Sequence, residues 1–151
     1  MEVFVYNYTK KRLPFKKREL EDLIRKILKV LKERRKVSLS LVFVPKRELK
    51  KINKFWRKEN KETTVLSFPY QVQEKGSFKE VDLGDIFLAI DLIKTKAKKL
   101  NLPFKEYFLG LLIHSICHLY GFTHKNEKER KRMEMLEKKI KEQIKTIKNK
   151  I

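Results

Sequence analysis

Cysteine, glycine, proline and acidic side chains are all scarce in this chain of 151 residues. Its single cysteine excludes an internal disulfide and suits a reducing compartment. Only 19 aspartates and glutamates stand against 39 lysines and arginines, so the formal net charge is +20. Lysine-rich surfaces also occur in thermophilic proteins, where ion pairs contribute to stability. Here the acidic residues are too few to pair with all the basic ones, so stability alone does not explain the charge. A field of this sign attracts polyanions, so we expect a nucleic acid partner.

Long apolar runs are absent as well, and no stretch could span a bilayer. The first five residues have neither the basic segment nor the apolar core of a signal peptide. We therefore expect a cytoplasmic protein that does not act at a membrane. With 41% hydrophobic residues and no linker or repeat, residues 1–151 are predicted to form a single domain with one core.

The hydrophobic pattern predicts an α+β fold, in which a mixed four-stranded sheet packs against about five helices. Strands are expected over residues 3–8, 37–44, 65–68 and 83–89. Residues 70–82 are expected to form a loop or hairpin connection. Helices are expected over residues 15–34, 45–56, 91–100 and 127–148, with one more beginning near residue 103 and carrying the histidines. The histidine helix is apolar almost all round, so it should be buried at the centre.

Four apolar residues recur at helical spacing in the second predicted helix, namely Leu49, Ile52, Phe55 and Trp56. This spacing predicts that they form its buried side. The alternative for Phe55 and Trp56 is that they stack on nucleic acid bases. Core packing is the favoured interpretation of the two.

All three histidines of the chain lie within eleven residues, at His114, His118 and His124. The first two are four apart, which places both imidazoles on one face of a helix. Gly121 is the residue best able to end that helix, so that the chain turns back and offers His124 from a loop. Three protein nitrogens and one open position are typical of catalytic zinc, so we expect one Zn²⁺ per chain. Cys117 should point away from the ion. The competing interpretation, a pair of core histidines, does not account for the third.

Metallopeptidases share similar spacing in the pattern His-Glu-x-x-His-x-x-Gly-x-x-His. In this chain Ser115 occupies the position of the glutamate. That glutamate is the general base of peptide hydrolysis, and a serine hydroxyl cannot replace it at neutral pH. Proteolysis therefore loses its main support, while the ligand spacing remains.

The run His-Ser-Ile-Cys-His-Leu-Tyr-Gly-Phe-Thr-His, residues 114–124, resembles the signature of the YbeY family, His-Gly-x-Leu-His-Leu-x-Gly-Tyr-Asp-His. Residues 53–57 and 63–69 resemble that family's Asn-x-x-Tyr-Arg and Thr-Asp-Val-Leu-Ser-Phe-Pro segments, and residues 83–86 resemble its Leu-Gly-Asp-Ile strand. Positions that differ from the signature include Ser115 in place of glycine, Cys117 in place of leucine and Thr123 in place of aspartate. A role of that aspartate cannot be carried over to this chain.

The resemblance implies a zinc-dependent single-strand endoribonuclease that acts in ribosomal RNA maturation and ribosome quality control. Its implied partners are ribosomal RNA and ribosomal particles, with no small-molecule cofactor. Phosphodiester cleavage also needs a cation that offsets charge in the transition state. Arg57 matches the arginine of the family's Tyr-Arg segment and is predicted to supply that charge. Ser67, Asp85 and Ser115 are candidates to line the cleft, with a structural role as the alternative for the first two.

Three basic clusters are predicted to contact the RNA backbone without reading its sequence. They comprise Lys10, Lys11, Arg12, Lys16, Lys17, Arg18, Arg34, Arg35 and Lys36. Two alternative functions stay open. An RNA-binding or ribosome-binding factor with a mainly structural zinc would bind RNA without metal-dependent cleavage, whereas a metallohydrolase of another substrate would have no use for the large positive charge.

Overall fold

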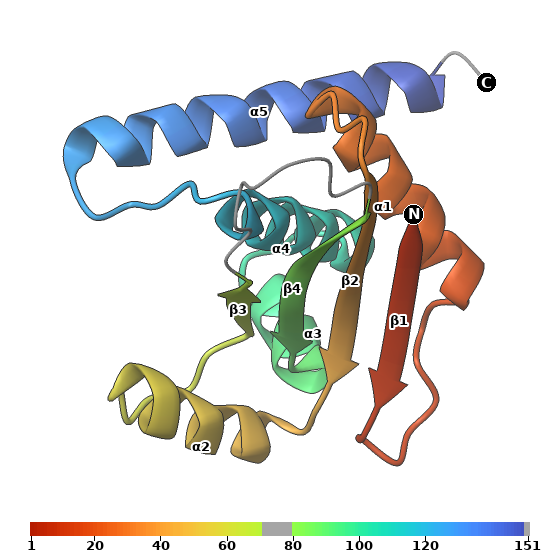
Figure 1. The fold of residues 1–151 in the computed structure, drawn as a ribbon. Helices are drawn as coiled ribbons and strands as arrows, with labels where there is room; N and C mark the ends of the chain where they lie inside the picture. The colour runs from red at the N-terminus through yellow and green to blue at the C-terminus, as the bar shows by residue number, and fades with distance from the viewer. Residues whose placement is uncertain (71–79, 150–151) are drawn as a thin grey trace.

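The protein folds around one mixed sheet with the strand order β1-β2-β4-β3 (Figure 1). A computed structural model describes residues 1–70 and 80–149. β2 (Lys36–Phe43) pairs in parallel with β1 (Glu2–Asn7) and with β4 (Glu80–Leu88), and β3 (Val65–Pro69) pairs antiparallel to β4. The expected four-stranded mixed sheet is therefore confirmed. The predicted connection after Tyr70 lies mostly outside the described residues, and β4 begins three residues earlier than expected.

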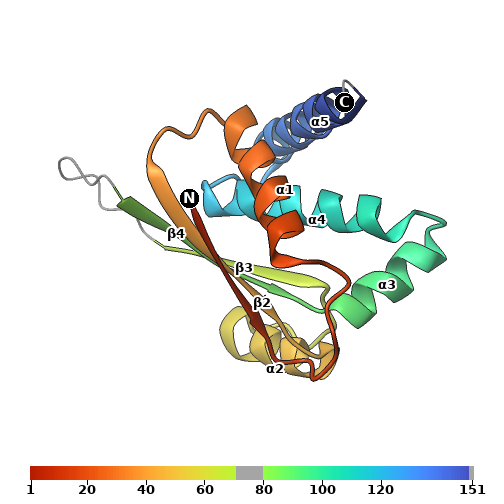
Figure 2. The same ribbon diagram turned by 90° about the vertical axis from the view of Figure 1, so that its right-hand side faces the viewer.

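Helices cover both faces of the sheet (Figure 2). The helices are α1 (Lys17–Val30), α2 (Lys46–Arg57), α3 (Ile90–Lys99), α4 (Phe104–Leu119) and α5 (Glu127–Asn149). Helices α1 and α4 pack on one face and α5 lies across them, while α2 packs alone on the other face. The first helix is shorter than expected because the chain leaves helical geometry soon after Val30, where Lys32 has a φ of 58°. Within the described residues, no helix combines the length and apolarity needed to cross a membrane.

Helix α4 is the centre of the main core. Its residues Phe108, Leu112 and Ile116 are fully buried, and they pack in the same cluster as Leu39 of β2 and Ile86 of β4. The expected central position of the histidine-bearing helix is therefore confirmed. Any metal site on α4 is mounted on the least mobile part of the fold, because a close-packed interior holds side chains in single conformations.

The prediction that Phe55 and Trp56 belong to the core is wrong. Their exposed fractions are 67% and 65%, whereas Leu49 on the same helix is fully buried. The reason is that α2 covers the β3 edge of the sheet, and its last turn extends past that edge strand (Figure 1). At that turn the buried position is taken by Asn53, whose side-chain amide donates to the carbonyl oxygen of Lys61 at 3.1 Å.

The end of α4 is tied to the loop between α1 and β2 by Glu33. The Tyr120 hydroxyl donates to Glu33 Oε1 at 2.9 Å, and Arg35 Nη2 donates to the same oxygen at 2.8 Å. Burial by itself would raise the pKa of Glu33, but the hydrogen bonds from Arg35 and Tyr120 outweigh it and lower this pKa from about 4.5 to about 2. Burial and the bond to Glu33 raise the pKa of Tyr120.

Glu33→Gln is expected to lower the melting temperature at pH 7 and to have little effect near pH 2. Because the pKa of Glu33 is depressed in the folded state, its ionised form stabilises the fold above pH 4.5 and loses that contribution as the pH falls towards 2. Thermal unfolding at several pH values measures the difference, with the exposed Glu48→Gln as the control. A difference between wild type and Glu33→Gln that does not change with pH would contradict the role assigned to Glu33.

Candidate metal centre

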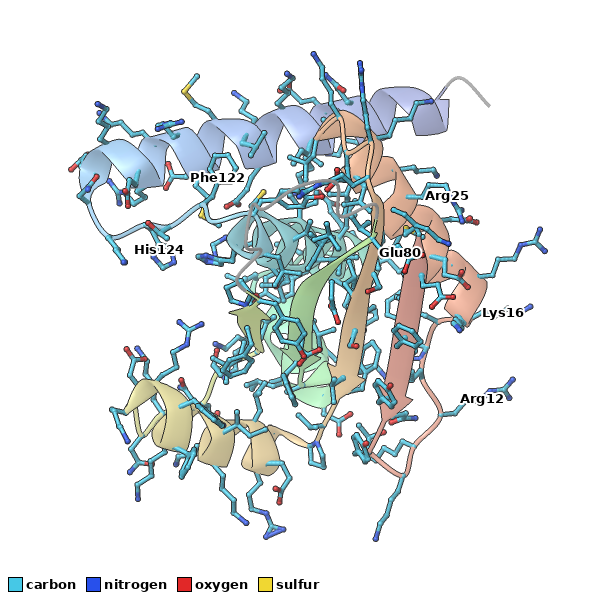
Figure 3. All side chains as sticks on the ribbon, viewed as in Figure 1. Arg12, Lys16, Arg25, Glu80, Phe122 and His124 are labelled. Carbon is cyan, nitrogen blue, oxygen red and sulfur yellow. The ribbon has the colours of Figure 1, made fainter. Side chains whose placement is uncertain are left out.

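The three histidines converge as the spacing predicts. His114 and His118 lie one turn apart near the end of α4, and the chain then passes through Gly121, whose φ of 90° is unfavourable for other residues. This turn brings His124 back from the loop that precedes α5 (Figure 3). One ring nitrogen of each histidine lies within 4.8 Å of those of the other two. Among the His, Cys, Asp and Glu side chains of the described residues, these three histidines form the group whose ligand atoms lie close enough together to hold one metal ion.

Hydrogen bonds fix which nitrogen of each α4 histidine faces the centre. His118 Nδ1 lies 2.8 Å from the carbonyl oxygen of Phe122, which can only accept, so Nδ1 carries the proton. His114 Nδ1 similarly donates to the Glu137 carboxylate at 2.8 Å. With the proton on Nδ1, the neutral form of each ring has its lone pair on Nε2, and the two Nε2 atoms are 3.0 Å apart. Two lone pairs at this distance repel each other unless a cation lies between them, so the donor set fits a divalent metal ion.

The lowered pKa of His118 also suits a metal ligand. Burial and the neighbouring charge of His114 lower the pKa of His118, although its hydrogen bond to Phe122 acts in the other direction. His118 is therefore neutral at pH 7, which is the form that binds metal. Cys117 is fully buried in the core on the other side of α4, and burial raises the pKa of its thiol to about 12. As expected, it takes no part in the site.

Arg57 reaches this site from the end of α2. Its Nη2 atom donates to the carbonyl oxygen of Ser67 at 2.9 Å, which fixes the guanidinium group against β3. Its positive charge is one of the causes of the lowered pKa of His118, so the two side chains lie within electrostatic reach of each other. Ser67 itself is buried on the α4 face of β3. The structure thus places Arg57 and Ser67 on the part of β3 that packs against the histidine-bearing helix α4.

Two other candidates for the cleft lie elsewhere. Ser115 is fully buried, and its hydroxyl donates to the carbonyl oxygen of Leu111 in its own helix at 2.8 Å, so it faces the core. Asp85 accepts a hydrogen bond from the Tyr70 hydroxyl at 2.8 Å. Because its neighbour Ile86 packs in the core around α4, strand alternation turns Asp85 to the face that α2 covers. The structure therefore does not bring Ser115 or Asp85 to the histidines.

The predicted RNA-contacting clusters at residues 10–12 and 16–18 lie far from the histidines, whereas Arg35 of the third cluster shares Glu33 with Tyr120 at the end of α4. Figure 3 shows Arg12 and Lys16 at the β1 side of the sheet and His124 at the opposite side. Residues 34–36 lie at the start of β2. Some of these cations are paired on the surface, such as Lys11 with Asp91 and Lys36 with Glu80, both at 3.2 Å. Exposed pairs of this kind are weak and can exchange for phosphate, so contact with the RNA backbone stays a prediction.

Two functional candidates on α5 were missed by sequence reasoning. Glu137 orients His114, and Glu129 accepts a hydrogen bond from the Thr123 hydroxyl beside His124. Glu129 thus contacts the residue that precedes the third histidine, where this chain has threonine and not aspartate. Glu137 did carry a signal, because it stands between Met133 and Ile140 on the apolar stripe of its helix, where a charged residue is out of place.

Glu137→Ala is expected to weaken metal binding by roughly 10-fold to 100-fold, because His114 loses the partner that fixes its tautomer and ring orientation. Competition with a chromogenic chelator measures the affinity. Glu134→Ala is the matched control, since Glu134 is exposed one turn earlier on the same helix. Equal affinities for the two variants would show that His114 is oriented by packing alone.

The fold and the site define an α+β protein with a candidate metal site, in which three imidazoles come from a buried helix and the turn that follows it. The chain matches the family described as Endoribonuclease YbeY over residues 5–145, and it belongs to that family. An Endoribonuclease YbeY of Phytoplasma australiense is 33% identical over 144 residues, covering 95% of this chain and 96% of that protein. The same-named protein of Agrobacterium fabrum is 39% identical over 104 residues, which are 69% of this chain and only 62% of that longer relative.

A solved structure has the same fold. The solution structure of a protein from Thermotoga maritima superimposes with a TM-score of 0.61 at 27% sequence identity. The match covers 94% of this chain and 88% of the Thermotoga chain. The α+β architecture is therefore shared across nearly the whole length of both proteins.

Proposed function

We propose that this protein is a zinc-dependent single-strand endoribonuclease that acts in the cytoplasm, in ribosomal RNA maturation and ribosome quality control. The observation that carries the proposal is the convergence of three imidazoles, whose ligand atoms lie within 4.8 Å of one another. Membership in a family whose relatives are named endoribonucleases supports RNA as the substrate. Ser115 in place of the glutamate that follows the first histidine of the metallopeptidase motif argues against peptide hydrolysis.

The chain's own residues have separable tasks in this reaction. His114, His118 and His124 would hold the ion, while Glu137 and the Phe122 carbonyl keep the first two rings in the binding orientation. When bound, zinc would supply the Lewis acid for the phosphodiester. Arg57 would bind a phosphate oxygen and offset the negative charge of the transition state. Its bond to Ser67 uses one of the five guanidinium N–H donors, so the group is positioned and still able to bind an anion.

The net charge of +20 supports ribosomal RNA and ribosomal particles as partners. The basic clusters at residues 10–12, 16–18 and 34–36 would contact the backbone of the substrate outside the cleaved segment. Such contacts are independent of sequence and add affinity rather than specificity. The cleavage site would then be selected by what the metal centre and its immediate surroundings accept.

Removing the metal is expected to abolish cleavage of a single-stranded ribosomal RNA fragment, and one equivalent of zinc should restore it. Loss of the ion removes the Lewis acid, so the rate should fall at least about 100-fold. Cleavage is measured by gel electrophoresis of end-labelled RNA, and binding is measured in parallel. Zinc-loaded protein that binds RNA without cutting it would instead indicate the binding factor. Failure of RNA to bind at all would indicate a metallohydrolase of another substrate.

A further inference from the structure

The last turn of α2 carries Phe55 and Trp56, which together with the partly buried Phe68 of β3 form an aromatic surface. Phe55 and Trp56 are about two-thirds exposed. Their ring centroids are 5.1 Å apart, and the Trp56 ring lies 6.2 Å from that of Phe68, which in turn contacts Phe87 in the sheet at 5.6 Å. The exposed rings are thus anchored to the fold at one end. Adjacent large aromatic side chains that remain in water are typical of a binding surface.

This aromatic surface adjoins the metal centre through Arg57. The Arg57 guanidinium lies 5.9 Å from the ring centroid of Phe68 and belongs to the same helix as Trp56. The same guanidinium is held by the Ser67 carbonyl oxygen on β3, and β3 packs against α4, the helix that carries His114 and His118. A molecule bound to Arg57 by a phosphate would therefore present its neighbouring groups to Trp56.

The charge around the aromatic surface identifies its occupant. The Lys58 ammonium group lies 5.8 Å from the Phe55 ring centroid. Glu48 is the single acidic residue among residues 46–58, whereas seven are basic: Lys46, Arg47, Lys50, Lys51, Lys54, Arg57 and Lys58. Aromatic faces surrounded by cations match a nucleic acid strand, in which flat bases alternate with phosphates. An apolar protein segment would leave this positive charge without a partner.

We propose that Trp56, supported by Phe55, stacks on a base of single-stranded RNA next to the phosphate that Arg57 binds. The inference deepens the proposed endoribonuclease function and depends on it. A base in a duplex has both faces covered by its neighbours, so only an unpaired base can stack in this way. The aromatic surface would therefore select single strands, and because every base has a flat face it would be tolerant of sequence.

Trp56 is the only tryptophan of the chain, so its fluorescence reports directly on this surface. Titration of the zinc-loaded protein with a single-stranded 2′-O-methyl oligonucleotide should quench the emission, and the same sequence as a duplex should not. Trp56→Ala should weaken binding of a labelled single strand at least about fivefold, whereas Trp56→Tyr should retain most of it. In cleavage assays, Trp56→Ala should raise KM with little change in kcat.

Tyr8→Ala is the matched control, because Tyr8 is also an exposed aromatic residue, at 63%, but follows β1 on the far side of the sheet. Wild-type binding by Trp56→Ala, with its fold checked by circular dichroism, would overturn the stacking proposal and point to a protein as the occupant. Quenching by the single strand without RNA cleavage would support stacking and contradict the endoribonuclease function. Cleavage with an unchanged KM in Trp56→Ala would contradict stacking alone.

Discussion

His118→Ala should reduce cleavage of a structured ribosomal RNA fragment at least about 100-fold, the largest loss of activity expected for a single substitution. Loss of a residue that merely orients a ligand typically costs 10-fold to 100-fold, and loss of a ligand should cost more. The three rings form a triangle, in which the His118 centroid lies 4.5 Å from that of His114 and 5.1 Å from that of His124. Without it, the two remaining imidazoles cannot enclose an ion.

The comparison requires that both proteins are purified identically, loaded with zinc and shown to be folded by circular dichroism. Lys125→Ala provides the control, because Lys125 is an exposed residue directly after His124 and is not one of the three candidate metal ligands. The zinc content of each protein is measured alongside cleavage. Equal cleavage by wild type and His118→Ala would indicate a contaminating nuclease, and the three-histidine site would then have no role in the reaction.

Gly84→Ala should destabilise the fold by about 3 kcal/mol or more, because it combines backbone strain with a steric clash. Gly84 has a φ of 132°, and a Cβ atom there would lie 2.2 Å from the carbonyl oxygen of Phe68. That oxygen belongs to β3, the strand paired with β4 at this point, so it cannot move without breaking the sheet edge. The same Cβ would also press on Leu119 at the end of α4. Denaturant unfolding measures the loss of free energy.

Gly110→Ala is the matched control for Gly84→Ala and should act in the opposite direction. Gly110 lies within α4, and a Cβ there would meet only the flexible end of Lys141 at 3.6 Å. Replacing a helical glycine by alanine without strain typically stabilises a protein by about 0.5–1 kcal/mol. If the two variants shifted the unfolding free energy by the same amount, the close approach of β3 and β4 at Gly84 would not be a constraint on the fold.

Local patterns explain which features could be predicted. The order of strands and helices follows from hydrophobic periodicity, which reflects the geometry of each element by itself. The metal-ligand set was also predictable, because His114 and His118 are one helical turn apart and Gly121 allows the reversal that returns His124. The boundaries were less accurate, as at α1, which ends before the expected residue.

The exposure of Trp56 shows the limit of such patterns. Periodicity identifies the apolar face of α2, but the edge of the sheet decides how much of that face is covered. Asn53 fills the buried position near the end of the helix because its amide finds the Lys61 carbonyl, a partner eight residues away. An aromatic residue that would otherwise belong to a core thus remains available for binding.

The sequence by itself determined the three-histidine motif, the arrangement of elements around it and the positive charge, because each depends on residue identity and short-range spacing. Tertiary packing alone accounts for the contact of Glu137 with His114, for the hydrogen bond that holds Arg57 on β3, and for the positions of Ser115 and Asp85 away from the histidines. These contacts join residues whose separation along the chain is unrelated to their distance in space. They arise from how α2, α4 and α5 pack on the two faces of one sheet, which no local pattern specifies.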